Sequence, residues 1–166
     1  MKFRRYSIKS RESKRLLFDI SKRFAFDLQS FFTKKSKIEF IEIDNGNLIL
    51  IEGKPLFFKT SNLLIPTLLF TEFHSCLPRI TVDMGAIPFV CKGANVMIPG
   101  IVGVDGDFKE GDLLLVVDEK HSKTIAIAES LLFSDELCKI KKGVAAKNLH
   151  FVGDKIWNFA TKLIEK

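Results

Sequence analysis

The sequence predicts an α+β protein, with a small N-terminal α/β domain over residues 1–76, a mainly β domain over residues 79–157 and a C-terminal helix over residues 154–166. Three observations favour this class. Apolar residues recur at helical spacing early in the chain, they alternate from Ile38 onward, and many short apolar runs separated by turns follow Ile80. Short strands around one apolar interior are typical of a small barrel, so we expect a pseudo-barrel after Ile80.

The first helix is expected to begin near Ser10, after a short charged edge strand at residues 4–9. Its apolar positions follow helical spacing and are expected to face the core rather than a ligand: Leu16, Leu17, Ile20 and Phe24. Basic residues lie between them and are expected on the outer face: Arg11, Lys14, Arg15, Lys22 and Arg23. A second helical piece is expected to run as far as Phe32.

An antiparallel meander of three strands is predicted next, because apolar residues alternate on both sides of two turn signals. Asn45-Gly46 is a strong hairpin signal, and residues 52–55 form the second turn, which leads into residues 56–59. The phenylalanines of this meander are expected to pack against the first helix. Residues 65–73 are expected to form a short apolar helix that belongs to the core.

The second domain is organised around residues 82–101, which predict a strand, a short apolar helix, a glycine-bounded loop and a second strand. Gly85 ends the first strand, Pro88 lies in the first helical turn, and Gly93 can take the left-handed conformation that ends a helix. The loop carries little side-chain bulk, so we expect it to present free backbone N–H groups to phosphate or sugar. We name residues 92–100 the ledge.

The rest of the second domain is predicted as short strands joined by turns. These strands are expected at residues 102–104, 113–118, 124–128 and 143–151. Ser134 is expected to begin a single helical turn, and Asp154 is expected to cap the C-terminal helix.

Four stretches resemble one family. The string D-x-G-A-I-x-F-V-x-x-G-A-N-V-M-x-P-G-I at residues 83–101 resembles the opening of a PUA domain, the RNA-binding module of pseudouridine synthases and archaeosine transglycosylases. The string KKGVAAKNLHFVGDKIW at residues 141–157 resembles the closing segment of PUA proteins related to the malignant T-cell amplified sequence protein and its archaeal counterparts. GKPLFFK at residues 53–59 and IPTL at residues 65–68 are similar to the N-terminal domain of that group.

The resemblance implies an RNA-binding face made of the short helix, the ledge and the last strands. The residues that it implicates are Lys92, Gly93, Ala94, Asn95, Met97, Gly100, Lys142 and Lys147. Asn95 has a second interpretation, because its side chain could cap the loop internally. Several family members carry arginines where this chain has Ala94 and Pro99, which shifts weight for RNA binding onto the basic residues of the first helix.

The positive charge is concentrated in the first part of the chain. Residues 1–37 hold 12 lysines and arginines against three acidic residues, a net charge of +9, whereas residues 38–79 carry −2 and residues 80–166 carry −1. The formal net charge of the whole chain is +6. A charge run is often only a solvated face, but an excess of this size is expected to attract phosphate over a distance.

Catalysis is not expected, and neither is a cofactor or a metal site. The sequence contains no G-x-S-x-G, P-loop or dinucleotide-binding motif, and its three histidines have no metal-ligand partner at helical spacing. The three cysteines are far apart, without a C-x-x-C pair, and Cys91 is expected to be a small buried hydrophobe. No apolar run reaches the length of about 18 residues that a membrane span needs, and no signal peptide is recognised. We therefore expect a reduced, cytoplasmic protein without membrane contact.

The expected function is recognition of structured RNA, either rRNA or tRNA, by shape and backbone contacts. The resemblance implies a place near the small ribosomal subunit or the initiator tRNA during translation initiation or ribosome recycling. One alternative is a protein-interaction adaptor, in which residues 63–73 dock a translation-factor partner. A second alternative is a non-catalytic accessory subunit of an RNA-modifying enzyme.

Overall fold

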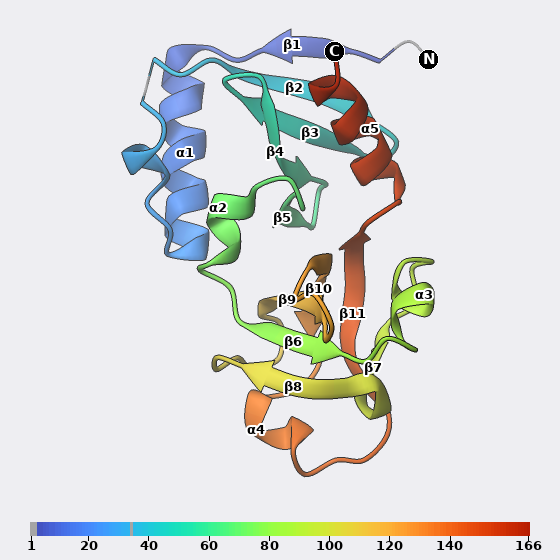
Figure 1. The fold of residues 1–166 in the computed structure, drawn as a ribbon. Coiled ribbons are helices and arrows are strands. Elements are labelled where there is room, and N and C mark those ends of the chain that lie inside the picture. Colours follow the sequence, from blue (N-terminus) through green and yellow to red (C-terminus); the bar gives the residue numbers. More distant parts are fainter. Residues whose placement is uncertain (1–2, 34) are drawn as a thin grey trace. The chain divides into compact units, whose positions relative to one another are not determined.

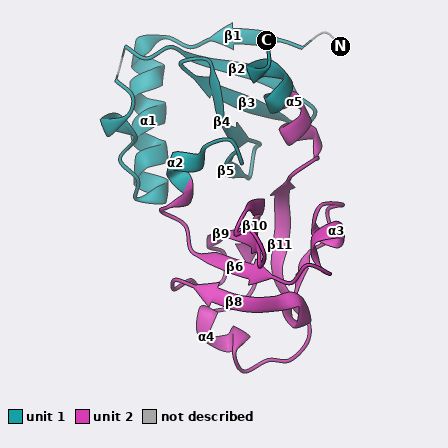
Figure 2. Cartoon of the chain, viewed as in Figure 1, with its two compact units in different colours: residues 1–73, 160–166 teal, residues 74–159 magenta. Residues whose placement is uncertain are grey.

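The computed structural model describes residues 3–33 and 35–166, and it divides into two compact units (Figure 1, Figure 2). Unit 1 consists of residues 1–73 and 160–166, and unit 2 consists of residues 74–159. The described structure combines one helix-flanked antiparallel sheet in unit 1 with a curled, mainly β unit 2, so the predicted α+β class is confirmed.

The sheet of unit 1 has five strands in chain order, and every neighbouring pair is antiparallel. Its strands are β1 (Arg5–Ser7), β2 (Ile38–Ile43), β3 (Gly46–Ile51), β4 (Lys54–Lys59) and β5 (Leu64–Pro66). The predicted meander corresponds to β2, β3 and β4, and the predicted edge strand corresponds to β1. At this edge the guanidinium of Arg5 donates two hydrogen bonds, of 3.1 and 2.9 Å, to the buried carboxylate of Glu39.

Helix α1 (Ser10–Phe24) begins where the sequence predicts, and Leu17 and Ile20 of its apolar stripe are buried. Phe24, its last residue, stacks on Phe57 of β4 with ring centroids 6.2 Å apart, and meets the edge of the Phe73 ring at 5.1 Å. The expected packing of phenylalanines between helix and meander is therefore confirmed.

The predicted second helix ending at Phe32 is wrong. Ala25 ends α1 in the left-handed conformation, with φ of +50°, and only a short 3-10 turn, η1 (Leu28–Ser30), follows. This break turns Phe26 toward the core, where its ring lies 4.8 Å from that of Phe73. Burial of an aromatic ring outweighs the few backbone hydrogen bonds that a continued helix would add.

The predicted helix over residues 65–73 is also wrong, although its apolar side chains do lie in the core. Pro66 belongs to β5 and pairs with Phe57, and only α2 (Thr71–His74) is helical. Pro66 lacks a backbone N–H, which an edge strand tolerates. The hydroxyl of the buried Thr67 donates to the carbonyl of Pro55 over 2.7 Å and ties the segment to β4. These side chains are not open to a protein partner.

The hairpin between β2 and β3 forms at the expected place, but its two loop residues are Asp44 and Asn45. Asp44 takes the positive φ of +47°, and Gly46 already pairs with Ile43. A Cβ on Gly46 would lie 2.6 Å from the carbonyl oxygen of Lys59. Glycine is required here by the close approach of β4, rather than by the turn.

Unit 2 contains a six-stranded sheet in the order β7-β11-β10-β9-β6-β8, and it curls around an apolar interior (Figure 1). Its strands are β6 (Arg79–Val82), β7 (Val96–Met97), β8 (Ile101–Asp105), β9 (Leu113–Asp118), β10 (Thr124–Ser130) and β11 (Val144–Phe151). Strands β6 and β9 are parallel, and the other neighbouring pairs are antiparallel. The predicted mainly β pseudo-barrel is confirmed, while the two-residue strand β7 was not predicted.

Three α-helices and one 3-10 helix complete the described fold: α3 (Ile87–Val90), η2 (Ile98–Gly100), α4 (Ser134–Leu137) and α5 (Lys155–Ile164). Asp154 caps α5 as predicted, since its Oδ1 accepts the N–H of Trp157 over 2.7 Å. Its other oxygen accepts the N–H of Phe151 and lies 2.7 Å from Nδ1 of the buried His150.

Replacing Asp154 with asparagine is expected to lower the free energy of unfolding at pH 7 by about 1–2 kcal/mol, mainly because the charge-assisted hydrogen bonds with His150, Phe151 and Trp157 are weakened or lost. Burial opposes ionisation of Asp154, but hydrogen bonds from His150, Trp157 and Phe151 outweigh it and hold the pKa below its ordinary 3.8. Because the folded-state pKa is lowered, this stability is present above about pH 4 and is lost as the pH falls through the folded-state pKa.

Denaturant titrations at pH 7 and at about pH 3 check this expectation, with the exposed Asp135→Asn as control. A difference between wild type and Asp154→Asn that stays constant over this range would contradict the expectation.

Candidate nucleic-acid interface

The approach to the ledge is set by Asp83, which follows β6. Its side chain accepts the N–H of Ala86 over 2.8 Å, and its own N–H donates to the carbonyl of Gly100 over 2.9 Å. These bonds hold the start of α3 against the end of the ledge. Pro88 lies in the first turn of α3, as predicted.

Gly93 ends the helical turn with φ of +95°, which confirms the sequence interpretation. The expectation of free backbone N–H groups is wrong for the first half of the ledge. The N–H groups of Lys92 and Ala94 donate to the carbonyl of Phe89, and that of Gly93 donates to the carbonyl of Val90. A ligand would therefore meet side chains here rather than a cradle of backbone donors.

Asn148 of β11 fastens the ledge to the barrel, a role that sequence reasoning missed. Its side-chain amide donates to the carbonyls of Val90 and Ala94, each over 3.0 Å. Its backbone N–H donates to Oδ1 of Asn95 over 3.0 Å, so the Asn95 side chain is engaged within the protein, by β11 rather than by its own loop. Asparagine is uncommon inside strands, and that was the signal available in the sequence.

Pairing between β7 and β11 brings the closing segment to the ledge. Met97 lies opposite Val144, and the N–H of Ile98 donates to the carbonyl of Gly143 over 2.9 Å. Lys142, which directly precedes Gly143, is thereby held beside the ledge. Lys147 lies further along β11, in register with Glu129 of β10.

Most predicted contact residues are exposed. Side chains or backbone reach solvent at Lys92, Gly93, Ala94, Asn95, Met97, Lys142 and Lys147, whereas Gly100 is half-buried. The structure thus brings the ledge and Lys142 together. It also places the backbone of Lys147 beside the ledge, between Ala146, which pairs with Val96, and Asn148, which bonds to Asn95. Whether these residues contact RNA stays a prediction.

A hollow of about 560 Å³ opens along the ledge, and its lining is mostly apolar. Phe89, Met97 and Val144 contribute to it, and their side chains are 67%, 48% and 36% exposed. Asp83 is the charged residue of the lining, and its carboxylate is already engaged with Ala86. Exposed aromatic and apolar surface beside lysines is suited to the face of a nucleobase with phosphates at its flanks.

Comparison with known proteins assigns the chain to a family. Residues 78–152 match the model of the PUA domain, and residues 4–72 match a model described as a domain of unknown function, DUF1947. Translation machinery-associated protein 20 of Saccharomyces cerevisiae is 33% identical over 143 residues, which cover 81% of this chain and 79% of the yeast protein. The chain belongs to the translation machinery-associated protein 20 family.

Other relatives agree with this assignment to a PUA protein family. Human malignant T-cell-amplified sequence 2 is 26% identical over 140 residues, covering 81% of this chain and 77% of the human protein. The crystal structure of a hypothetical protein from Pyrococcus horikoshii is similar with a TM-score of 0.78 and 29% identity, covering 95% of this chain and 99% of that chain. The predicted family resemblance is confirmed. Family membership supports an RNA-binding role connected with translation.

The second candidate surface lies on α1, outside the PUA domain. Its predicted basic side chains are all exposed: Arg11, Lys14, Arg15, Lys22 and Arg23. The guanidinium of Arg23 lies 5.5 Å from the ring centroid of Phe24. Within residues 3–33 and 35–166, no salt bridge involves one of these five basic side chains. Their positive charge is therefore not neutralised by direct ion pairs.

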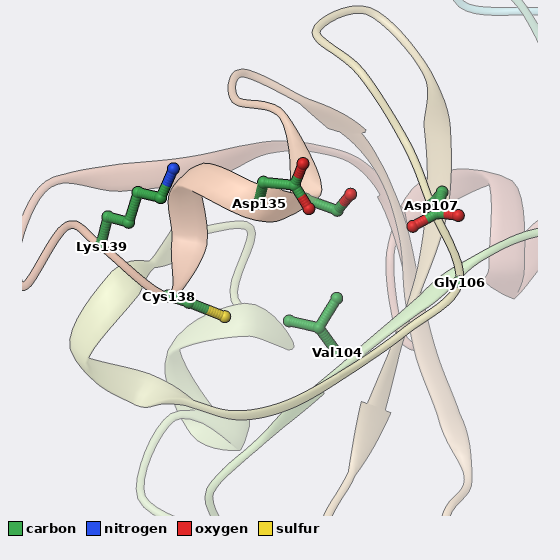
Figure 3. A pocket seen from close by; sticks show the side chains of 7 residues that line it. Val104, Gly106, Asp107, Asp135, Cys138 and Lys139 are labelled. Atoms are coloured by element: carbon green, nitrogen blue, oxygen red, sulfur yellow. The ribbon is translucent and has the colours of Figure 1, made fainter.

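A larger hollow of about 650 Å³ on the PUA domain lies between β8 and α4, and it does not suit nucleic acid (Figure 3). Asp107 and Asp135 line it together with Val104, Cys138 and Lys139. Two carboxylates against one ammonium group repel phosphate. Charge therefore favours the ledge over this hollow as the RNA-facing surface of the PUA domain.

No feature of the described residues points to cofactor chemistry. Burial raises the pKa of the Cys91 thiol, which keeps it protonated and makes it a poor nucleophile. Among the described residues, no group of three or more His, Cys, Asp or Glu side chains could hold a metal ion. In the same part of the chain, no helix is both long and apolar enough to cross a bilayer.

Proposed function

We propose that the protein binds structured RNA, either rRNA or tRNA, during translation initiation or ribosome recycling. The ledge of the PUA domain would make the close contact, and the basic face of α1 would add attraction to phosphate. The observation that carries this proposal is the exposed apolar hollow at the ledge, with Lys92 and Lys142 beside it. The proposed partner is the small ribosomal subunit or the initiator tRNA, and the supporting observation is membership of a translation machinery-associated family.

The geometry favours recognition of shape and of unpaired bases over reading of a duplex. Because the N–H groups of residues 92–94 are occupied within the protein, phosphates would be held by lysine side chains. Phe89 and Met97 would contact the face of a base that has left its stack. The lining of the hollow is mostly apolar and offers few side-chain hydrogen-bond donors for base edges, so we expect weak sequence preference.

Replacing Lys92 and Lys142 with glutamine is expected to weaken binding of tRNA or small-subunit rRNA by about tenfold at low salt, since two phosphate contacts are lost. The slope of log affinity against log salt concentration should fall by about 1.5. Filter binding of the full-length protein over a salt series measures both quantities.

The matched control is Lys120→Gln with Lys123→Gln, two exposed lysines on the β9–β10 hairpin of the same unit. This control removes the same charge from the PUA domain, so it reproduces the general loss of electrostatic attraction. We expect that loss to lower the affinity by no more than about twofold. If the wild-type protein binds neither RNA, or binds without salt dependence, the proposed function is wrong.

A further inference from the structure

The outer face of α1 carries an aromatic side chain that the fold does not explain. Residues three and four apart lie next to one another on a helix, so Arg11, Arg15, Phe18 and Lys22 form one stripe. At 100° per residue this stripe lies on the face of α1 opposite the buried positions Leu17 and Ile20, and Phe18 is 56% exposed. Phe18 does not belong to the hydrophobic core, and an exposed phenylalanine does not stabilise a solvated cationic face.

The surroundings of Phe18 are cationic rather than apolar. Lys14 lies one turn before it and lines a separate hollow of about 260 Å³, whose other lining residues are Leu17, Gln29, Phe32 and Thr33 and do not include Phe18. Asp19, also exposed, is the acidic residue nearest the stripe along the helix, next to Arg15 and Lys22 by spacing. No ring contact of Phe18 is found among the described residues. The ring is therefore open to a ligand.

A ring framed by cations fits single-stranded RNA better than the other polyanions. Unpaired bases stack on aromatic side chains while neighbouring lysines and arginines follow the phosphates. A duplex hides the faces of its bases, and an acidic protein segment would need apolar surface around the ring to bury its own side chains. Arg11 and Lys22 are separated by about 16 Å along the axis, enough for a short run of nucleotides.

We propose that Phe18 stacks on an unpaired base of the bound RNA, while Arg11, Arg15 and Lys22 hold the phosphates on either side. This inference rests on the proposed RNA-binding function and adds a second, single-strand-specific contact in unit 1. The RNA therefore carries an unpaired segment in addition to the part that meets the ledge.

The test uses the full-length protein and two fluorescent RNA probes, a ten-nucleotide oligoadenylate and the same strand with abasic central positions. Phe18→Ala is expected to weaken binding of the first probe by about tenfold, since stacking on one base is lost. Phe18→Trp should keep the affinity, and Phe133→Ala, which removes another exposed phenylalanine, should not change it. The abasic probe should bind wild type and Phe18→Ala equally, and the salt slope should be the same for both proteins.

Several results would overturn the inference without touching the proposed function. If Arg11→Gln with Arg15→Gln weakens binding while Phe18→Ala does not, the face holds phosphate only. If the abasic probe still binds wild type more tightly than Phe18→Ala, the ring does not stack on a base. If an acidic glutamate-rich peptide binds with a larger dependence on Phe18 than the RNA does, the face is a protein-docking surface.

Discussion

Replacing Arg11, Arg15 and Lys22 together with glutamate is expected to lower affinity for tRNA or rRNA by about a hundredfold or more at low salt. Three attractive charges become repulsive on one exposed face of α1. The slope of log affinity against log salt concentration should fall by about 2 to 3, because about three phosphate contacts are lost. Filter binding across a salt series measures the change.

The matched control is Lys35→Glu with Lys54→Glu and Lys59→Glu, three exposed lysines of the same unit that lie outside α1. This control reverses charge without touching α1. Thermal melts should place both variants close to wild type, since a glutamate near the end of α1 costs only about 0.3–1 kcal/mol. Equal losses in the control and the α1 variant would show that net charge, rather than this face, governs affinity.

Replacing Asn148 with leucine is expected to lower the free energy of unfolding by about 2–3 kcal/mol, because the carbonyls of Val90 and Ala94 lose their donor. The bond from the backbone of residue 148 to Asn95 can remain. With the ledge no longer fastened to β11, RNA affinity should fall by about tenfold or more, corresponding to at least about 1.4 kcal/mol. Denaturant titration and filter binding check the two effects separately.

Asn158→Leu is the matched control for this change. Its amide also donates to a backbone carbonyl, that of Gly153, but the residue is exposed on α5. We expect a loss of stability below about 1 kcal/mol and unchanged RNA binding. If Asn148→Leu unfolds more easily yet binds RNA as wild type does, the fastening of the ledge is structural only.

The parts of the fold that local pattern determines were predicted well. The helical spacing in α1, the turns that separate β2, β3 and β4, and the cap at Asp154 all follow from neighbours in the sequence. The errors occurred where contacts with residues distant in the sequence determine the local structure. Ala25 breaks the helix because Phe26 joins the ring cluster around Phe73, and Pro66 becomes a strand residue because β4 is there to pair with it.

The candidate site shows the same division. The glycine pattern and Pro88 predicted the short helix and its end at Gly93. The pattern did not reveal that Asn148, 58 residues after Val90, occupies its carbonyl, or that the ledge N–H groups are used internally. It also gave no sign of the hollow beside Phe89, since hollows arise from packing between β7, α3 and β11. Phe18 lies outside the apolar stripe in the sequence, and only its exposure in the structure indicates that it could contact a ligand.

The most direct measurement is photo-crosslinking of the full-length protein to tRNA and small-subunit rRNA carrying 4-thiouridine, followed by peptide mapping. We expect crosslinked peptides from residues 86–101 and 141–149 and from α1, with the signal reduced by added salt. Crosslinks confined to residues 104–112 and 133–139, around the acidic hollow, would contradict this account, as would the absence of any crosslink under conditions where the RNA binds.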